Sequence, residues 1–384
     1  MKNIAILLPA MRMGGAEKVF LNFLSDLKQY YKVTVILNKR EGELLNELPE
    51  QLEVLEHPIL SFKQVVRRDI QKINWKGLLF DFIYYFRVKS NRISEKDYEQ
   101  LISRMPMLER KFDCAIAYVG NVSTQIFELK HRIMADKKIV WIHGETNELH
   151  DSELFGKIYS SFDKIYTVSQ VSRKHFIEKY PSCSFITDVY YNRIVAQDIV
   201  EKAKMPVKFG MNPNSINIVT VGRMSPEKGQ ILIPDIVRIL RSKNMPIEWY
   251  MIGDGTEKTV IENRCSELQM SPYVHFLGTI TNPYPYMKAC DIYVQPSFEE
   301  GYSTTICEAG ILGKPIVGTI TSGGITEQII DGFSGLLAQP TADSLSCKIE
   351  YLITHPDEKQ KIQENIQRVD FSNKNEIYKI CNVI

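Results

Sequence analysis

Continuous apolar runs, each followed by a loop and then by an amphipathic segment, recur along the whole chain. The first run is Asn3–Leu8 (NIAILL), and a similar run, Ile216–Val221 (INIVTV), opens the second half. Such runs predict central strands of parallel sheets, which are buried on both faces. Further strands are predicted at 33–37, 112–119, 138–142 and 164–168, and then at 248–252, 274–277, 291–295 and 316–318.

The segments between these strands have helical periodicity. In 16–27, five apolar residues share one face: Val19, Phe20, Phe23, Leu24 and Leu27. Other helices are predicted at 171–180, 231–242, 257–268, 284–289, 306–312, 344–353 and 357–369. A regular alternation of strand and helix predicts an α/β fold built on parallel sheets.

The length of the chain, 384 residues, corresponds to about two domains of roughly 100–200 residues each. We assign residues 1–190 to the first domain and 215–370 to the second. Residues 191–214 are predicted to be a linker, because they contain Pro206, Gly210 and Pro213 and no strong strand. A last helix is predicted within 371–384, and the sequence leaves open whether it crosses back to the first domain.

Composition narrows the class of protein. A formal net charge of +1 gives no overall argument for nucleic-acid binding. The seven cysteines are scattered and form no C-x-x-C pair, which argues against a zinc ribbon or a disulfide framework and favours a reducing cytosol. No apolar run approaches the ~18 residues that a membrane span requires, and the first run is too short for a signal peptide. We expect a cytoplasmic protein.

One stretch, 61–92, differs from the rest and belongs to a helical insert of the first domain at about 61–110. It contains eight basic and two acidic residues, interleaved with aromatic ones such as Trp75, Phe82 and Phe86. Basic and aromatic residues on helices suit an anionic membrane surface, here the inner face of the cell membrane, or a lipid-linked acceptor. An ordinary helical cap with solvated lysines explains the pattern nearly as well, and nucleic acid is a weaker alternative.

The stretch 295–324 carries the main candidate site. Pro296 ends a strand, a loop with Glu300, Gly301 and Tyr302 follows, and Ser303, Thr304 and Thr305 are N-cap residues of a helix that contains Glu308. Unpaired N–H groups at such a helix start suit a phosphate, and the two carboxylates suit ribose or sugar hydroxyls. The alternative is that both glutamates are solvated acids that favour the helix dipole.

Three other strand ends supply candidates. After Val221 comes GRMSPEKG, in which Gly222 allows a tight turn and Arg223 and Lys228 could neutralise a diphosphate. Gly253 opens a G-D-G turn after the strand 248–252. In the first domain, Gly14 and Gly15 follow the first strand, where adjacent glycines allow backbone N–H groups to approach a diphosphate, although a mere tight turn is an equal alternative. His143 ends the strand 138–142.

Two motifs together resemble a known family. The segment SFEEGYSTTICEAGILGKPIVG, with Glu300 and Glu308 at the E-x7-E spacing, and the loop GRMSPEKG resemble the family-4 retaining glycosyltransferases of bacterial polysaccharide and glycolipid synthesis. The resemblance implies the GT-B fold, in which two Rossmann-like domains with parallel sheets face a central cleft.

The resemblance also implies roles for the candidate residues. Glu308 would accept the ribose hydroxyls, Glu300 would hold a sugar hydroxyl, and His143 would lie near the transferred sugar. Arg223 and Lys228 would stabilise the departing diphosphate, together with the helix start near Thr304. The expected catalytic residues are therefore His143, Glu300, Arg223 and Lys228. The donor would also contact the remaining residues: Gly14, Gly15, Gly222, Gly253, Gly301, Tyr302, Ser303 and Thr305.

The implied activity is retaining transfer of a hexose or N-acetylhexosamine from a nucleotide diphosphate sugar to a hydroxyl of a glycan or of a polyprenol-linked acceptor. UDP-sugar is the favoured donor. No cofactor is expected, and no metal, because no D-x-D stands at a convincing strand end. Two alternatives remain: a nucleotide-sugar epimerase or hydrolase of the same fold, and an inactive nucleotide-sugar-binding subunit.

Overall fold

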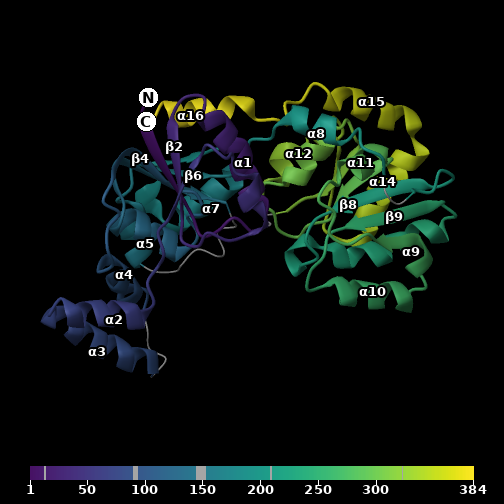
Figure 1. Ribbon diagram of the computed structural model, residues 1–384. Helices are drawn as coiled ribbons and strands as arrows, with labels where there is room; N and C mark the ends of the chain where they lie inside the picture. Colours follow the sequence, from purple (N-terminus) through teal and green to yellow (C-terminus); the bar gives the residue numbers. More distant parts are fainter. Residues whose placement is uncertain (13, 90–93, 144–152, 208–209, 322) are drawn as a thin grey trace. The chain divides into compact units, whose positions relative to one another are not determined.

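The computed structural model describes residues 1–384 except 13, 90–93, 144–152, 208–209 and 322 (Figure 1). The chain divides into two compact units. Unit 1 comprises Met1–Thr167, Arg173–Tyr190 and Ile377–Ile384, and unit 2 comprises Val168–Ser172 and Tyr191–Glu376. Because the chain passes between the units more than once, neither unit is a single continuous segment.

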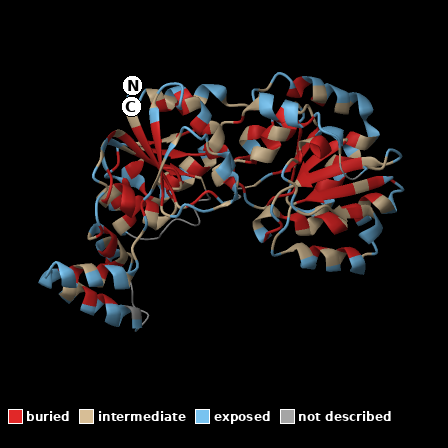
Figure 2. Ribbon diagram, viewed as in Figure 1, coloured by how far each residue is buried: buried red, intermediate tan, exposed pale blue. Residues whose placement is uncertain are grey.

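Unit 1 is built on a parallel sheet that has seven strands in the described part of the chain, in the order β3-β2-β1-β4-β5-β6-β7. The strands are β1 (Asn3–Leu8), β2 (Lys32–Leu37), β3 (Glu53–Glu56), β4 (Lys111–Ala117), β5 (Met134–Ile142), β6 (Lys164–Thr167) and β7 (Thr187–Val189). Ile6 pairs with Val35 on one side and with Ile116 on the other. The central strands are buried, as Figure 2 shows in red.

The helices of unit 1 are α1 (Gly15–Leu27), α2 (Phe62–Gln71), α3 (Trp75–Lys89), α4 (Glu95–Ser103), α5 (Ser123–His131), α6 (Glu153–Tyr159), α7 (Gln170–Lys179), whose first turn belongs to unit 2, and α16 (Ile377–Cys381). They pack around this sheet, except for α2 and α3, which project away from it (Figure 1). Helix α1 buries the five residues that its periodicity predicts. Helix α7 begins where Ser169 caps it, because the Ser172 N–H donates to Ser169 Oγ at 3.0 Å.

Unit 2 is built on a second parallel sheet, with six strands in the order β10-β9-β8-β11-β12-β13 among the described residues. The strands are β8 (Ile216–Val221), β9 (Ile247–Ile252), β10 (Val274–Phe276), β11 (Ile292–Gln295), β12 (Ile316–Thr319) and β13 (Leu336–Ala338). Its helices are α8 (Ala196–Lys202), α9 (Ile233–Ser242), α10 (Lys258–Glu267), α11 (Tyr284–Ala289), α12 (Thr304–Ile311), α13 (Ile325–Gln328), α14 (Ala342–Thr354) and α15 (Pro356–Ile366).

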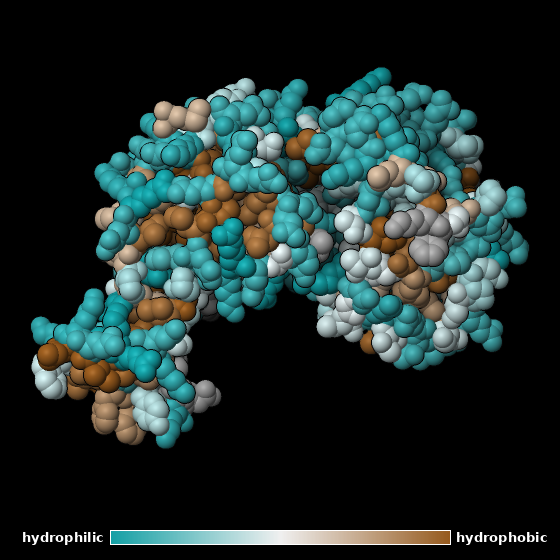
Figure 3. All heavy atoms as spheres, viewed as in Figure 1, coloured by the Kyte–Doolittle hydropathy of each residue, from teal (hydrophilic) through white to brown (hydrophobic). Residues whose placement is uncertain are grey.

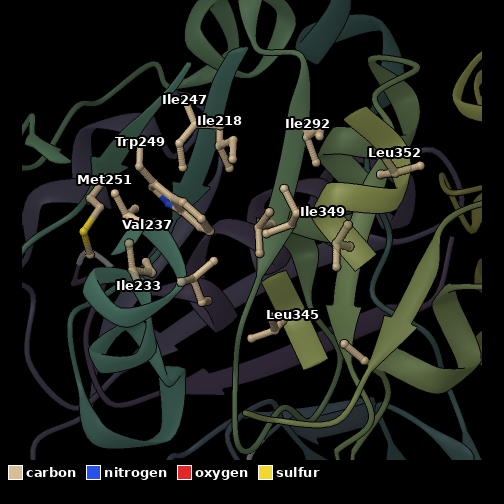
Figure 4. Close-up of a cluster of buried hydrophobic side chains, with 14 of the residues drawn as sticks. Ile218, Ile233, Val237, Ile247, Trp249, Met251, Ile292, Leu345, Ile349 and Leu352 are labelled. Carbon is tan, nitrogen blue, oxygen red and sulfur yellow. The ribbon is translucent and has the colours of Figure 1, made fainter. Parts of the chain in front are cut away.

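One apolar core of unit 2 lies between its sheet and helices α9 and α14, and a second includes residues of α11 and α12. In Figure 4, the fully buried Trp249 lies near Ile218 of β8 and near Ile233 and Val237 of α9, and the same cluster includes Leu345, Ile349 and Leu352 of α14. The α/β fold with two parallel sheets, as predicted from the sequence, is confirmed.

The predicted linker, 191–214, needs correction. It contains helix α8, and Ile194 and Ile199 are 3% exposed within the core of unit 2. The segment therefore packs as part of unit 2 from Tyr191 onward. Its Pro and Gly residues suggested a linker, but two buried isoleucines on either side of the start of a seven-residue helix are enough to fix it to the sheet's helical layer.

The segment 371–384, predicted as a last helix, contains α16, which packs in unit 1. Ile377 and Ile380 are buried, and the Tyr166 hydroxyl donates to the carbonyl oxygen of Lys379 at 3.0 Å. None of the described helices is both long and apolar enough to cross a membrane.

Candidate functional site

Glu300 and Lys228 form an ion pair at the carboxyl edge of the six-stranded sheet. Lys228 Nζ lies 2.8 Å from Glu300 Oε1, and the two side chains are 22% and 8% exposed. Lys228 ends a short 3-10 turn after β8, and Glu300 lies in the loop between β11 and α12. A nearly buried ion pair of this kind fixes both side chains in place, because either charge alone would lose hydration without compensation.

Beneath this pair lies a buried amide, that of Gln295, the last residue of β11. Its Nε2 donates to Ser297 Oγ at 2.8 Å and to Glu300 Oε1 at 3.2 Å. Its Oε1 accepts from the Tyr293 hydroxyl at 2.7 Å and from Thr305 Oγ1 at 3.0 Å. The amide therefore links the carboxylate of Glu300 to the first turn of α12.

The start of α12 is held from the other side by Gln328. Gln328 Oε1 accepts from the backbone N–H of Ser303 at 3.0 Å, and its Nε2 donates to the carbonyl oxygen of Ser303 at 2.7 Å. Ser303 is the N-cap residue, as predicted, and the helix begins at Thr304, two residues earlier than expected. The next backbone N–H groups, from Thr304 to Ile306, are the ones that a helix start leaves for an anion.

The loops at this edge of the sheet interlock through their backbones. The Met224 N–H donates to Asp254 O at 2.9 Å, the Phe298 N–H to Glu227 O at 2.8 Å, and the Gly324 N–H to Glu300 O at 2.9 Å. Four strand ends are thereby joined into one rigid rim. Such a rim suits precise contacts to a ligand, because its loops already hold one another through their backbones.

Two glycines make this close approach possible. Gly253 has a φ of +141°, and a Cβ there would lie 2.0 Å from the Gly222 carbonyl oxygen. Gly229 has a φ of +60°, and a Cβ there would lie 2.1 Å from the Pro296 carbonyl oxygen. Gly253 is predicted from the sequence to contact the sugar donor. The close approach of the Gly222 carbonyl oxygen is a structural reason for glycine at this position.

The other predicted residues of unit 2 lie around this rim. Arg223 is 73% exposed and its Nη2 lies 3.6 Å from Glu227 Oε1, so it is not part of the Lys228–Glu300 pair. Glu308 Oε1 accepts from the Tyr284 hydroxyl at 3.2 Å. Tyr302 is engaged elsewhere, since its hydroxyl accepts from Asn373 Nδ2 at 3.0 Å. Gly301 lies in the same loop as Glu300.

The remaining predicted residues belong to unit 1. Gly14 is the N-cap of α1 with extended backbone, and a Cβ on Gly15 would meet no atom within 4 Å. The space beside Gly15 is therefore open, and neither glycine is required by backbone strain in this loop.

His143 follows β5 directly and packs among aromatic rings. Its ring centroid lies 4.3 Å from that of Tyr118 and 5.3 Å from that of Trp141. Burial lowers the pKa of His143 to about 3, so its imidazole is neutral at physiological pH. Within the described residues, its buried Nε2 has no hydrogen-bond partner. A neutral ring with a free nitrogen can donate to or accept from a ligand hydroxyl, but it cannot act as a general acid.

The sequence reasoning missed Gln295, Ser297, Gln328 and Tyr284, whose side chains hold the predicted residues in place. A signal existed for Gln295, because it is a polar residue that ends an otherwise apolar strand. Among the described residues, no group of three or more His, Cys, Asp or Glu side chains is arranged to hold a metal ion.

Comparisons with known proteins identify the kind of protein that this chain resembles. Residues 201–369 match the family model of the glycosyl transferases group 1. The chain is 23% identical to the N-acetylgalactosamine-N,N'-diacetylbacillosaminyl-diphospho-undecaprenol 4-alpha-N-acetylgalactosaminyltransferase of Campylobacter jejuni, over 88% of this chain and 86% of that protein.

Solved structures resemble the whole chain. HepE from Anabaena in complex with UDP matches with a TM-score of 0.74 and 19% identity, over 100% of this chain and 99% of that chain. A glycosyltransferase from Rickettsia africae matches with a TM-score of 0.70 and 17% identity, over 100% of this chain and 97% of that chain. The chain therefore has the GT-B fold predicted from its motifs, and its residues 201–369 match the model of the glycosyl transferases group 1.

Proposed function

We propose that this glycosyltransferase moves a hexose or N-acetylhexosamine from a UDP-sugar to a hydroxyl of a glycan or of a polyprenol-linked oligosaccharide, with retention of the anomeric configuration and without a metal ion. The observation that carries the proposal is the Lys228–Glu300 pair, held beside the start of α12, the helix that contains Glu308. A cation, a helix start and two carboxylates match a diphosphate flanked by a ribose and a sugar.

In the proposed reaction, the bond between the anomeric carbon and the β-phosphate oxygen breaks, and a bond from that carbon to the acceptor oxygen forms on the same face. The acceptor proton passes to the departing phosphate oxygen. Lys228, Arg223 and the N–H groups of α12 stabilise the negative charge that develops on the diphosphate. Glu300 holds a sugar hydroxyl while the carbon acquires oxocarbenium character. Glu308 holds the ribose.

The lipid-linked part of the proposal draws on the relative from Campylobacter jejuni, whose name includes a diphospho-undecaprenol acceptor. The UDP part draws on the Anabaena structure in complex with UDP. An acceptor of this kind is anchored in a membrane, and we therefore propose that the enzyme works at the inner, anionic face of the cell membrane, which the basic and aromatic segment 61–92 contacts.

The test replaces Lys228 by Gln, which keeps a hydrogen-bond donor beside Glu300 but removes the charge. We expect kcat to fall by about a hundredfold or more, because a stabilising charge on the leaving group contributes about 3 kcal/mol or more to the transition state. Lys243→Gln is the matched control, since Lys243 pairs with Glu350 at the surface. Assays contain a chelator, and nuclear magnetic resonance of the product reports the anomeric configuration.

Near-normal turnover of Lys228→Gln would place the site elsewhere. An inverted product, or a wild-type enzyme that is silent in chelator, would refute retention or metal independence separately. Incubation of donor without acceptor distinguishes the remaining activities: rapid epimerisation or hydrolysis would contradict glycosyl transfer as the main reaction.

A further inference from the structure

Helix α3 exposes a row of large apolar side chains, in addition to Phe80 and Tyr84, which pack against the core of unit 1. Trp75, Leu79, Phe82 and Phe86 recur at spacings of four and three residues and are 76%, 64%, 62% and 52% exposed. Of the twenty large hydrophobic side chains that are exposed in the described chain, eight lie between Ile70 and Phe86. Figure 3 shows apolar residues interleaved with hydrophilic ones over α2 and α3. A concentration of this kind marks an interaction surface.

The inner face of the same helix carries charge. Asp81 is buried, and Arg104, at the end of α4, contacts it through Nη1 at 2.8 Å. Nη2 of Arg104 contacts Asp69 of α2. The hairpin of α2 and α3 is thus fixed to α4 by ion pairs, with Tyr84 and Val65 in the apolar core beside them. Because these ion pairs occupy the inner face of α3, the apolar residues on its other face stay exposed.

The charges around the outward face have one sign. Between Ser61 and Lys89 both acidic residues, Asp69 and Asp81, are buried, whereas six basic side chains are exposed: Lys63, Arg67, Lys72, Lys76, Arg87 and Lys89. Arg87 is paired with Asp97 of α4. A second copy of this chain, docked face to face, would bring like charges together. An anionic lipid surface supplies both the opposite charge and an apolar phase.

We propose that helix α3 lies in the interface of an anionic bilayer, with Trp75, Phe82 and Phe86 among the upper acyl chains and Lys72 and Lys76 on the lipid phosphates. This deepens the membrane attachment proposed above and rests on it, because it identifies the element that makes the contact. The ion pairs of Arg104 with Asp69 and Asp81 hold the hairpin in a fixed position on α4.

Tryptophan fluorescence can report the contact between α3 and the bilayer. It has three tryptophans, and Trp141 and Trp249 are fully buried while Trp75 is 76% exposed. On addition of phosphatidylcholine vesicles that contain phosphatidylglycerol, we expect the tryptophan emission to move to shorter wavelength, because only Trp75 can leave water. Pure phosphatidylcholine vesicles and free glycerol phosphate should give little or no shift. Trp75→Phe should abolish the shift while the protein still floats with the vesicles.

Two double variants test the face by vesicle flotation. Lys72→Gln with Lys76→Gln should weaken binding by about twenty-five-fold, since each basic residue near an anionic surface contributes about fivefold. Phe82→Ser with Phe86→Ser should weaken it at least about tenfold, through the loss of buried apolar area. The matched controls are Phe185→Ser, at a side chain 97% exposed outside the hairpin, and Lys174→Gln with Lys361→Gln, on α7 and α15.

The results separate this inference from the catalytic proposal. The hairpin variants should keep their circular dichroism and their transfer to a short water-soluble acceptor, whereas Lys228→Gln should float normally and fail to transfer. Hairpin variants that float like the wild type would overturn the inference and leave the glycosyl transfer standing. Self-association of the wild type without vesicles, abolished by Phe82→Ser with Phe86→Ser, would also overturn it, in favour of a second copy.

Discussion

At the scale of single residues, two buried amide side chains hold the parts of the candidate site together. Gln295 and Gln328 each make hydrogen bonds through both ends of the side chain, and together they hold the loop before α12 and its first turn. Motif spacing singled out Glu300, Glu308 and Lys228 as candidates, because the resemblance to a known family rests on that spacing. It could not locate the amides, since their partners become neighbours only when the sheet forms.

Replacing Gln295 by Ala should therefore impair the site without touching a charged group. We expect kcat to fall by about tenfold or more, because Glu300 and Thr305 lose the group that aligns them, and stability to fall by about 2 kcal/mol through unpaired buried polar atoms. Donor affinity, measured by calorimetry, should change less than kcat. Gln295→Glu would bring a second carboxylate beside Glu300 and should be worse than Gln295→Ala; equal activity of all three proteins would contradict the role.

The low pKa of His143 predicts how the stability of the folded protein changes with pH. The folded protein keeps this imidazole neutral down to about pH 3, whereas the unfolded chain protonates it below its ordinary pKa of 6.5. The unfolded state thus binds more protons between these values, and stability falls as the pH falls through that window. From pH 7.5 to 5 the loss attributable to His143 is up to about 2 kcal/mol.

Urea unfolding of wild type and of His143→Gln at both pH values measures this effect. The variant, which has no imidazole at this place, should lose less stability on acidification than the wild type. Equal losses would mean that His143 titrates in the folded protein as it does in water.

At the scale of elements, the long apolar strands and the amphipathic helices could be predicted because their own residues determine them. Helix α1 and strands β1 and β8 lie where their patterns placed them. The missed elements have weak local signals. Strand β3, Glu53–Glu56, has acidic residues at both ends, and β7, Thr187–Val189, has three residues; both are sheet edges that pairing stabilises. Helix α8 is short and is held by packing.

The interlocked loops give a prediction at this scale. Gly229→Ala should abolish transfer and destabilise unit 2, because the added carbon would meet the Pro296 carbonyl oxygen at a positive φ. Gly278→Ala is a matched control: its φ is +69°, and a Cβ there would meet no atom within 4 Å. It should cost only about 1 kcal/mol of backbone strain. Thermal unfolding and turnover of both variants, if alike, would show that close approach of the loops does not matter.

At the scale of the whole molecule, the chain does not run through one unit and then the other. It leaves unit 1 after Tyr190, builds unit 2, and returns with α16 to pack in unit 1. Lys379 Nζ donates to the carbonyl oxygen of Val189 at 2.8 Å, so the returning segment is tied to the last strand of the first sheet. The sequence left this return open, because a short helix with two buried isoleucines could dock on either unit.

Ile380→Ala tests how much unit 1 depends on the returning segment. Ile380 is fully buried, and its truncation should cost about 2–4 kcal/mol, measured by denaturant unfolding. Asn382→Ala, at an exposed position just beyond α16, should be near neutral. A cost for Ile380→Ala no larger than that of Asn382→Ala would mean that α16 is loosely attached.

The returning segment also affects the order in which the two units can fold during translation. On the ribosome, every residue of unit 2 is translated before Ile377–Ile384 emerges, so the seven-stranded sheet must wait for its last helix while its neighbour can already fold. A nascent chain stalled or cleaved before Ile377 would present an uncovered apolar slot to chaperones and proteases. The segment Ile377–Ile384 therefore makes the folding of unit 1 depend on the prior synthesis of unit 2.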